Sequence, residues 1–178
     1  MCAVEYYSYE EYSQWKGDWE LIKGIPLALS PSPTVSHQVI ISEIVFELKK
    51  SLKESKKCLI LGGTDWKISN DTVVKPDVVL TCNETNDTYM TKAPEIIVEV
   101  ISKSTAKRDK QTKFKLYEEE GVKYYIIVYP NDLKAKVYKL ENGSYLKVAD
   151  FLTESYTFEE STCKASVDFG AVFERFRK

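Results

Sequence analysis

Apolar residues recur along the chain in short runs and in one longer stripe at helical spacing. Two short apolar runs, broken at Lys23-Gly24, lie between Trp19 and Leu29 and predict a β-hairpin or a bent strand pair. Pro26 would place the second run at the edge of a sheet, because proline has no N–H to donate to a neighbouring strand. The chain therefore opens with a predicted hairpin.

A helix is predicted from about Ser36 to Ser55, after the Ser-Pro-Ser-Pro stretch at 30–33. Its apolar stripe consists of Ile41, Ile44, Val45, Leu48 and Leu52. The other face should meet water and carries Glu43, Glu47, Lys49, Lys50 and Lys53.

Three strand candidates follow, each rich in β-branched residues and separated by polar or glycine-containing turns. They are CLILG with TDWKI (58–68), TVVKPDVVL (72–80) and PEIIVEVIS (94–102). We expect them to form the centre of a sheet.

A second helix should begin near Ser104 or Thr105 and end at Gly121, a residue suited to the left-handed conformation beyond a helix end. The run KYYIIVYP (123–130) predicts another buried strand. The segments 135–140 and 144–151 predict a C-terminal hairpin, because the Asn-Gly step between them favours a tight turn. The last ten residues are too few to assign.

Length and composition bound the class of protein. A chain of 178 residues predicts a single domain spanning 1–178, and 43% hydrophobic with 29% charged residues is typical of a globular protein. The N-terminal residues carry neither a basic region nor a long apolar run, so we expect no signal peptide, no membrane span and a cytoplasmic location.

The four cysteines, Cys2, Cys58, Cys82 and Cys163, show no C-x-x-C spacing, and the chain has one histidine. This pattern argues against a structural zinc site. Reduced thiols are the simpler interpretation, with Cys58 and Cys82 in the core.

The net charge of −2 argues weakly against nucleic-acid binding, because DNA is bound largely by neutralising its phosphates. However, six basic residues between Lys103 and Lys115 face a single acid, Asp109. A solvated helix face and a phosphate-binding face both fit this pattern.

Two acids interrupt apolar strands. Glu99 lies within the run 96–101, where an unpaired buried carboxylate would be costly, and Asp77 directly precedes Val78-Val79-Leu80. Two such carboxylates on adjacent strands would repel each other unless a divalent cation joined them, and Mg²⁺ or Mn²⁺ suits hard oxygen ligands. The alternative is that each acid pairs with a lysine or caps a turn at a strand end.

The ordered segments WELIKG, SPSPTVSHQ, TVVKPDVVL, PEIIVEVISKST and RDKQTKFKLYEEEGVKYYIIVYP resemble the Uma-two-like family of the PD-(D/E)XK nuclease superfamily. The resemblance covers about residues 19–150. It implies a restriction-endonuclease-like α/β fold, in which helices flank a mixed β-sheet, with an N-terminal hairpin and a C-terminal β-hairpin.

The resemblance also implies a site. Asp77 and Glu99 match the two metal-binding acids, Glu20 matches an early glutamate that completes the acidic cluster as a third metal ligand, and His37 matches a histidine common in the family. The superfamily's usual lysine would fall at position 101, which is Ile101 here.

A lysine on the following helix substitutes in the family, and Lys113, with Asp109 one turn earlier, is the expected counterpart. Lys103 and Lys110 are rivals. The implied function is hydrolysis of phosphodiester bonds in nucleic acid, most simply DNA, by a metal-dependent endonuclease in which Lys113 assists the attacking water. Lys107, Arg108 and Lys110 would hold the phosphate backbone without reading sequence.

Two other hypotheses remain open. Ile101 is compatible with an inactive module of the same fold that binds nucleic acid or protein, and a structural protein could use the acids only in ion pairs. A homodimer is the expected assembly. The sequence lacks G-x-S-x-G, a P-loop and G-x-G-x-x-G, which argues against a nucleophilic hydrolase and a nucleotide-binding fold. It does not identify the substrate.

Overall fold

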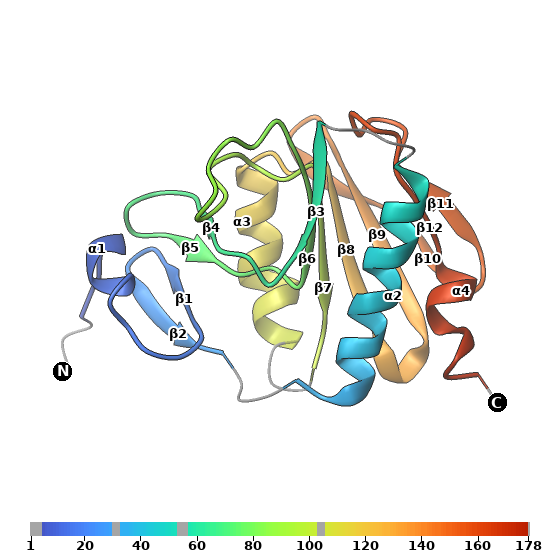
Figure 1. The fold of residues 1–178 in the computed structure, drawn as a ribbon, viewed down its shortest axis with the longest axis horizontal. Helices are drawn as coiled ribbons and strands as arrows, with labels where there is room; N and C mark the ends of the chain where they lie inside the picture. Colours follow the sequence, from blue (N-terminus) through green and yellow to red (C-terminus); the bar gives the residue numbers. More distant parts are fainter. Residues whose placement is uncertain (1–4, 30–32, 53–56, 103–105, 178) are drawn as a thin grey trace.

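A computed structural model describes residues 5–29, 33–52, 57–102 and 106–177. Its main feature is a mixed six-stranded sheet in the order β10-β9-β8-β7-β6-β3, in which only β7 and β8 pair in parallel (Figure 1). The strands are β3 (Cys58–Gly62), β6 (Val78–Cys82), β7 (Ile96–Val100), β8 (Tyr124–Tyr129), β9 (Lys134–Glu141) and β10 (Ser144–Phe151). The predicted mixed sheet flanked by helices is confirmed.

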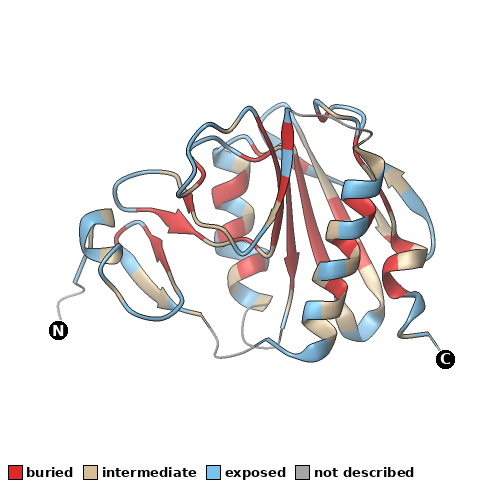
Figure 2. Cartoon of the chain, viewed as in Figure 1, coloured by how far each residue is buried: buried red, intermediate tan, exposed pale blue. Residues whose placement is uncertain are grey.

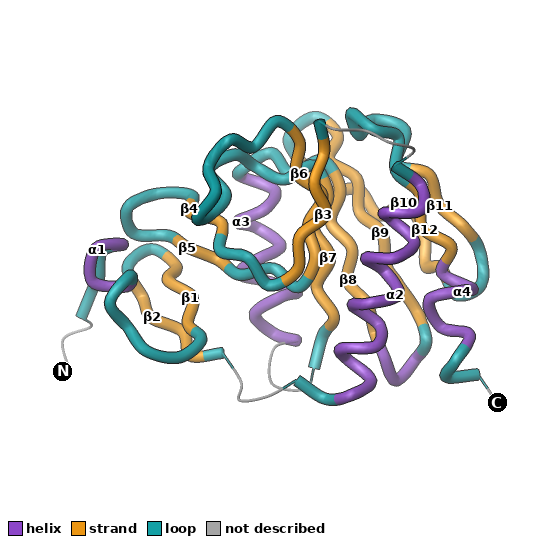
Figure 3. Tube along the Cα trace, in the orientation of Figure 1, coloured by secondary structure: helices purple, strands orange, loops and turns teal. Residues whose placement is uncertain are grey.

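Helices cover both faces of this sheet (Figure 3). On the first face lie α2 (Val35–Ser51) and α4 (Phe169–Glu174), and the core there includes Ile44 and Val98. On the second face lies α3 (Phe114–Glu119), preceded by the π-helix η1 (Arg108–Lys113), and the core there includes Tyr117 and Ile97. Every residue of β6 and β7 is buried, so the central strands appear almost continuously buried in Figure 2.

A second sheet of four short strands lies on the N-terminal side, in the order β2-β1-β5-β4 (Figure 1). Its strands are β1 (Trp19–Ile22), β2 (Ile25–Ala28), β4 (Trp66–Lys67) and β5 (Val73–Val74). β1 and β2 form the predicted hairpin, whose turn uses positive φ at Lys23 and Gly24. Pro26 lies in β2 at the edge, as predicted.

The remaining elements are short. They are α1 (Tyr9–Tyr12), the 3₁₀ helix η2 (Pro130–Asp132), and a two-stranded sheet of β11 (Ser155–Thr157) and β12 (Ser166–Asp168). β11, β12 and α4 were not predicted. In α4, Phe169, Val172 and Phe173 are buried against the first face, so tertiary packing stabilises a helix of only six residues.

Two expectations about the strands are wrong. The segment 72–80 is not one strand: Lys75 and Pro76 separate β5, in the small sheet, from β6, in the large one. Proline cannot continue a central strand, so the chain changes sheets there. The segment 58–62, expected at the sheet centre, forms the edge strand β3, and its Leu59 side chain is exposed.

The long helix matches its prediction in type but differs in two details of burial and at its end. Ile40, which the predicted apolar stripe omits, is fully buried in the core. α2 spans Val35–Ser51, and residues 53–56, including Lys53, lie outside the described part. Glu47, expected in water, is buried. Its carboxylate pairs with Lys50, whose Nζ lies 3.0 Å from Oε1.

The second helix differs from a regular α-helix. Residues 108–113 form a π-helix before α3 begins, and the predicted start at Ser104 or Thr105 lies outside the described residues. Gly121 has the predicted positive φ of 77° beyond the helix end. The C-terminal hairpin β9-β10 is also confirmed, with positive φ at Asn142 and Gly143.

Candidate metal and nuclease site

The pairing of β6 with β7 brings the two interrupting acids together. Val78 pairs with Val98 in the antiparallel register, so Asp77, one residue before β6, faces Glu99 on β7. The backbone N–H of Val100 donates to Asp77 Oδ2 at 2.7 Å. The sheet register therefore fixes both carboxylates at the carboxyl end of β7.

Lys113 reaches this pair from the π-helix. Its Nζ lies 2.8 Å from Glu99 Oε1, and its side chain is only 2% exposed. Because residues alternate between the two faces of β7, Glu99 points to the second face, where η1 packs. A lysine from the π-helix thus lies beside Glu99, although position 101 on the strand side is isoleucine.

Of the two rival lysines, only Lys110 lies in the described residues, and its ammonium lies against an aromatic ring. Lys110 Nζ lies 4.9 Å from the ring centroid of Tyr129, and Lys103 lies outside the described residues. Asp109 is buried beside Lys113, with 3.8 Å between Oδ1 and Nζ, as its spacing of four residues predicted.

Glu20 completes the cluster from the small sheet. Its fully buried side chain accepts a hydrogen bond from the Lys75 N–H at 2.9 Å, and its Oε1 lies 2.7 Å from Lys113 Nζ. Arg108 Nε lies 3.5 Å from Glu20 Oε2. Lys113 therefore joins a carboxylate of the small sheet to one of the large sheet.

His37 approaches from the N-terminal turn of α2. Thr34 caps this helix by accepting the His37 N–H, and His37 Nε2 lies 3.4 Å from Asp77 Oδ1. The side chains of His37 and Asp77 are 17% and 24% exposed, whereas those of Glu20, Glu99, Asp109 and Lys113 are below 5%. The cluster has a buried base, and Asp77 and His37 are its more exposed members.

The charges in this cluster are not balanced. Among the described residues it contains four carboxylates, on Glu20, Asp77, Glu99 and Asp109, and two cations, on Lys113 and Arg108. Burial raises the pKa of Glu99 well above its usual value; Lys113 opposes this shift, and the neighbouring acids, Asp77 foremost, add to it. For Lys113, burial would lower the pKa, but the surrounding carboxylates outweigh it and raise the value.

Tyr117 holds the second acid from α3. Its buried hydroxyl donates to Glu99 Oε1 at 2.8 Å. Burial, followed by the charge of Glu99, raises the pKa of Tyr117 well above its usual value, so the phenol remains a donor. The sequence analysis missed Tyr117, although its spacing of four residues from Lys113 places both on one helix face.

The donor set fits a hard divalent cation. Two carboxylates on adjacent strands, with an excess of negative charge around them, suit Mg²⁺ or Mn²⁺, which bind through one or two protein carboxylates together with water and substrate phosphate. Glu20 does not join Asp77 and Glu99 in a compact three-ligand group. In the described part of the chain, the only three such ligand atoms within 4.8 Å of one another belong to cysteines.

Basic side chains lie next to the acidic cluster. Lys107 and Lys110 are exposed, whereas Arg108 is partly buried against Glu20. The ammonium groups of Lys134 and Lys136 also lie near the Tyr129 ring, at 5.4 and 5.1 Å. Sequence analysis missed these two lysines, which alternate along β9 and therefore share one face of the strand.

The model of the Uma2 family, described as "Putative restriction endonuclease", matches residues 5–162. The chain belongs to the Uma2 family. The crystal structure of "a putative nuclease belonging to DUF820" from Anabaena variabilis ATCC 29413 is similar to it, with a TM-score of 0.74 at 14% identity, covering 94% of this chain and 98% of that one. No curated protein matches the sequence.

Membership of the Uma2 family confirms the resemblance seen in the sequence, and the solved structure confirms the fold. The structure brings together all five of the expected catalytic residues that it describes: Glu20, His37, Asp77, Glu99 and Lys113. No helix in the described residues is both long and apolar enough to cross a membrane.

Proposed function

We propose that this Uma2 protein is a divalent-metal-dependent endonuclease that hydrolyses phosphodiester bonds of nucleic acid, and that its substrate is DNA. The observation that carries the proposal is the position of Lys113, whose ammonium lies 2.8 Å from Glu99 although position 101 is isoleucine. Two acids and a lysine meet at one point, and the carboxylates of the cluster outnumber its cations. Ion pairs among these residues would leave negative charge uncompensated, so the arrangement supports a metal-dependent hydrolytic site more than a purely structural role.

Asp77 and Glu99 would hold Mg²⁺ or Mn²⁺, with Glu20 at the buried side of the cluster. The chemistry that such a cation supplies when bound is polarisation of a phosphoryl oxygen and a lowered pKa of water. Lys113, held charged by its carboxylate neighbours, would orient the attacking water and stabilise the negative charge that develops. Tyr117 would keep the Glu99 carboxylate oriented for this role.

His37 would act at the open side of the site. Its Nε2 faces Asp77 Oδ1, so the ring restrains the more exposed of the two acids. The partial exposure of both side chains also makes this the side from which a phosphate could enter.

The basic surface supports nucleic acid as the substrate. Glu99 pairs with Ile127 on β8, and Ile127 pairs with Lys136 on β9, so Lys136 lies on the Glu99 face of the sheet two strands away, about 10 Å at the usual strand spacing. Lys110, Lys134 and Lys136 surround Tyr129, an aromatic ring beside three cations. We propose that this surface, with Lys107 and Arg108, binds the phosphate backbone.

The first experiment is calorimetric titration of Mn²⁺ into the wild-type protein, Asp77→Asn and Glu99→Gln. We expect saturable binding that both substitutions abolish. Asp132→Asn is the matched control, because its carboxylate is 60% exposed and lies outside the acidic cluster. Retained binding in Asp77→Asn and Glu99→Gln, or no binding by the wild type, would overturn the proposed metal site.

The second experiment separates cleavage from binding. Supercoiled and linear DNA, single-stranded DNA and RNA are incubated with Mg²⁺ and the wild-type protein or Lys113→Met. We expect metal-dependent cleavage of DNA by the wild type, and its loss in Lys113→Met with Mn²⁺ binding retained. Metal binding without cleavage of any of these substrates would favour the inactive binding module instead.

The cytoplasmic location, the homodimer and the single domain remain predictions.

A further inference from the structure

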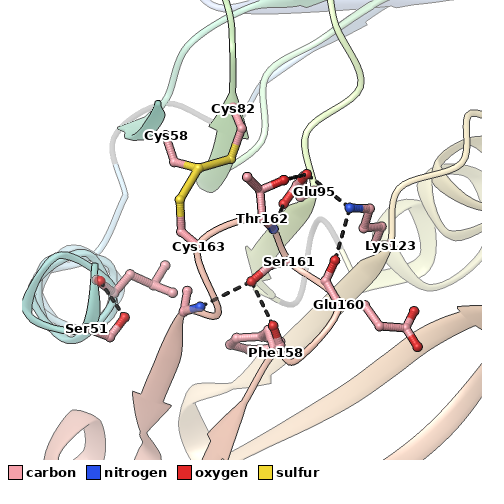
Figure 4. The surroundings of a disulfide bond; sticks show 12 residues. Ser51, Cys58, Cys82, Glu95, Lys123, Phe158, Glu160, Ser161, Thr162 and Cys163 are labelled. Atoms are coloured by element: carbon pink, nitrogen blue, oxygen red, sulfur yellow. Dashed lines mark hydrogen bonds and ion pairs between the residues drawn. A yellow bond between two sulfur atoms is a disulfide. The ribbon is translucent and has the colours of Figure 1, made fainter. Parts of the chain in front are cut away.

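Three cysteines that are far apart in the sequence meet at the opposite end of β6 from Asp77. Cys58 on β3 is the direct cross-strand partner of Cys82 on β6, with their Cα atoms 4.0 Å apart. Cys163 joins them from the loop between β11 and β12, with its Cα 6.9 Å from that of Cys58. The three Sγ atoms all lie within 4.8 Å of one another (Figure 4).

The arrangement is not that of an ordinary disulfide. Cys58 Sγ lies within bonding distance of both other sulfur atoms, but a sulfur forms only one disulfide bond at a time. The two Cα separations also lie just outside the usual range of about 4.4–6.8 Å, one below it and one above. A single ion bonded to all three sulfurs would satisfy them equally.

The loop that carries Cys163 is held in place by hydrogen bonds on both sides. The preceding residue, Thr162, donates from its N–H and its hydroxyl to the Glu95 carboxylate, at 2.6 and 2.7 Å. Ser161 Oγ donates to the Phe158 carbonyl at 2.7 Å and accepts the Ala165 N–H at 3.1 Å. The loop therefore presents Cys163 to the sheet edge in a fixed position.

We propose that Cys58, Cys82 and Cys163 form a trithiolate site for one thiophilic metal ion, of the class that includes Zn²⁺. Thiolate sulfur selects soft and borderline ions, and three protein ligands leave a fourth position of a tetrahedral ion for water. Cys58 and Cys82 are buried, and Cys163 is partly exposed, so the open position lies on the side of the loop.

This site is separate from the acidic one. Cys82 lies five residues after Asp77 along β6, about 17 Å at the rise of a β-strand. The acidic cluster offers hard oxygen ligands, whereas the cysteine cluster offers sulfur, so the two sites select different ions. The proposal therefore does not depend on nuclease activity.

Metal binding would add a link between parts of the fold that are otherwise connected by packing and hydrogen bonds. Cys58 and Cys82 lie on the edge strand and its neighbour, whereas Cys163 lies in the segment that leads into β12 and α4. An ion that binds only the folded arrangement stabilises it by mass action. Its removal should loosen α4 from the first face of the sheet.

The test uses the full chain, which is reduced and then desalted without oxygen. It is titrated with Cd²⁺, whose charge-transfer absorption reports binding to thiolates, and Zn²⁺ is then added in competition. We expect one equivalent per chain, protection of three thiols from alkylation, and a higher thermal midpoint. Cys163→Ser is the main variant, because Cys163 is the least buried of the three. Its affinity should fall by more than the 10- to 100-fold typical of losing an outer-shell partner.

Two control variants test whether the loss of affinity is specific to the cysteine cluster. Cys2→Ser removes the fourth cysteine and should change nothing, and Asp77→Asn should leave Cd²⁺ absorption intact. If Cys58→Ser or Cys82→Ser fails to fold, Cys163→Ser with an unchanged circular dichroism spectrum still decides. Full affinity in Cys163→Ser, or no binding by the reduced wild type, would overturn the proposal. A disulfide that persists when excess Zn²⁺ is added under reducing conditions would overturn it as well.

Discussion

Lys113→Met replaces the buried ammonium by an uncharged side chain of similar length. Nζ lies 2.7 Å from Glu20 Oε1 and 2.8 Å from Glu99 Oε1, and at an effective dielectric constant of about 20 each attraction is about 6 kcal/mol. The cost of removing the ammonium from water on folding offsets much of this attraction. Breaking a buried ion pair by removing one partner typically costs about 3–5 kcal/mol, and we expect that loss here.

The loss of unfolding free energy in Lys113→Met should depend on pH. Lys113 lowers the pKa of Glu99, so its removal raises that pKa further above the value in the unfolded chain. A carboxyl whose pKa is raised by folding binds more protons in the native state, and the stability of the native state then falls as the pH rises. The destabilisation of Lys113→Met should therefore be larger at pH 8 than near the unfolded pKa of Glu99, about 4.5.

The assay is urea unfolding of the metal-free protein at pH 5 and pH 8, followed by tryptophan fluorescence. Lys115→Met is the matched control: Lys115 lies in α3 with 75% of its side chain exposed, so its loss should cost below about 0.5 kcal/mol. In a Glu99→Gln background, Lys113→Met should cost less than in the wild type, because one of the unpaired charges is gone. A loss below about 1 kcal/mol, or one equal at both pH values, would refute the reasoning.

Two further predictions concern hydrogen bonds to carboxylates. Tyr117→Phe should cost about 1.5–3 kcal/mol of unfolding free energy, because it removes a buried hydrogen-bond donor to the Glu99 carboxylate. Tyr125→Phe loses a hydrogen bond to the neutral carbonyl of Asp109 and should cost only about 0.5–1.5 kcal/mol. Equal losses in urea unfolding would contradict this order. Burial would raise the pKa of Glu84, but four backbone N–H donors outweigh it and lower the pKa from 4.5 to about 2. Glu84 therefore stabilises the fold above pH 4.5, and this stability is lost as the pH falls toward 2. In thermal unfolding, Glu84→Gln should lower the unfolding free energy by about 1 kcal/mol at pH 7, a value reduced because Glu84 is partly exposed, and by almost nothing at pH 2. An equal loss at both pH values would exclude stabilisation by the charged carboxylate.

The acidic cluster combines charge with burial, a combination that costs stability. Glu20, Glu99 and Asp109 are almost fully buried beside one lysine and one arginine, and carboxylates in such surroundings cost free energy unless cations compensate them. The charge excess should make the metal-free protein less stable than the same fold with neutral side chains. A divalent cation at Asp77 and Glu99 would supply the missing positive charge.

The sequence by itself determined the local structure of this protein and the residue types of the candidate site. Hydrophobic patterning predicted α2 and most of the buried strands, because period 2 and period 3.6 are set by backbone geometry, and the turn residues at Lys23-Gly24 and Asn142-Gly143 predicted the two hairpins. An acid inside an apolar strand marked Glu99, and an acid at a strand start marked Asp77, because a buried carboxylate needs a cation or a hydrogen-bond partner. The family resemblance added Glu20, His37 and Lys113.

Only the tertiary structure decided which distant side chains meet. The break at Pro76 between two sheets, the six-residue helix α4 and the burial of Glu47 depend on packing against segments that no local pattern identifies. The sequence offered several lysines that could act in place of the one expected at position 101. The path of the π-helix decided between them, because it brings Lys113 next to Glu99. Spacing argued against a cysteine site, yet three cysteines converge, because strand register and loop docking set distances that separation along the chain does not.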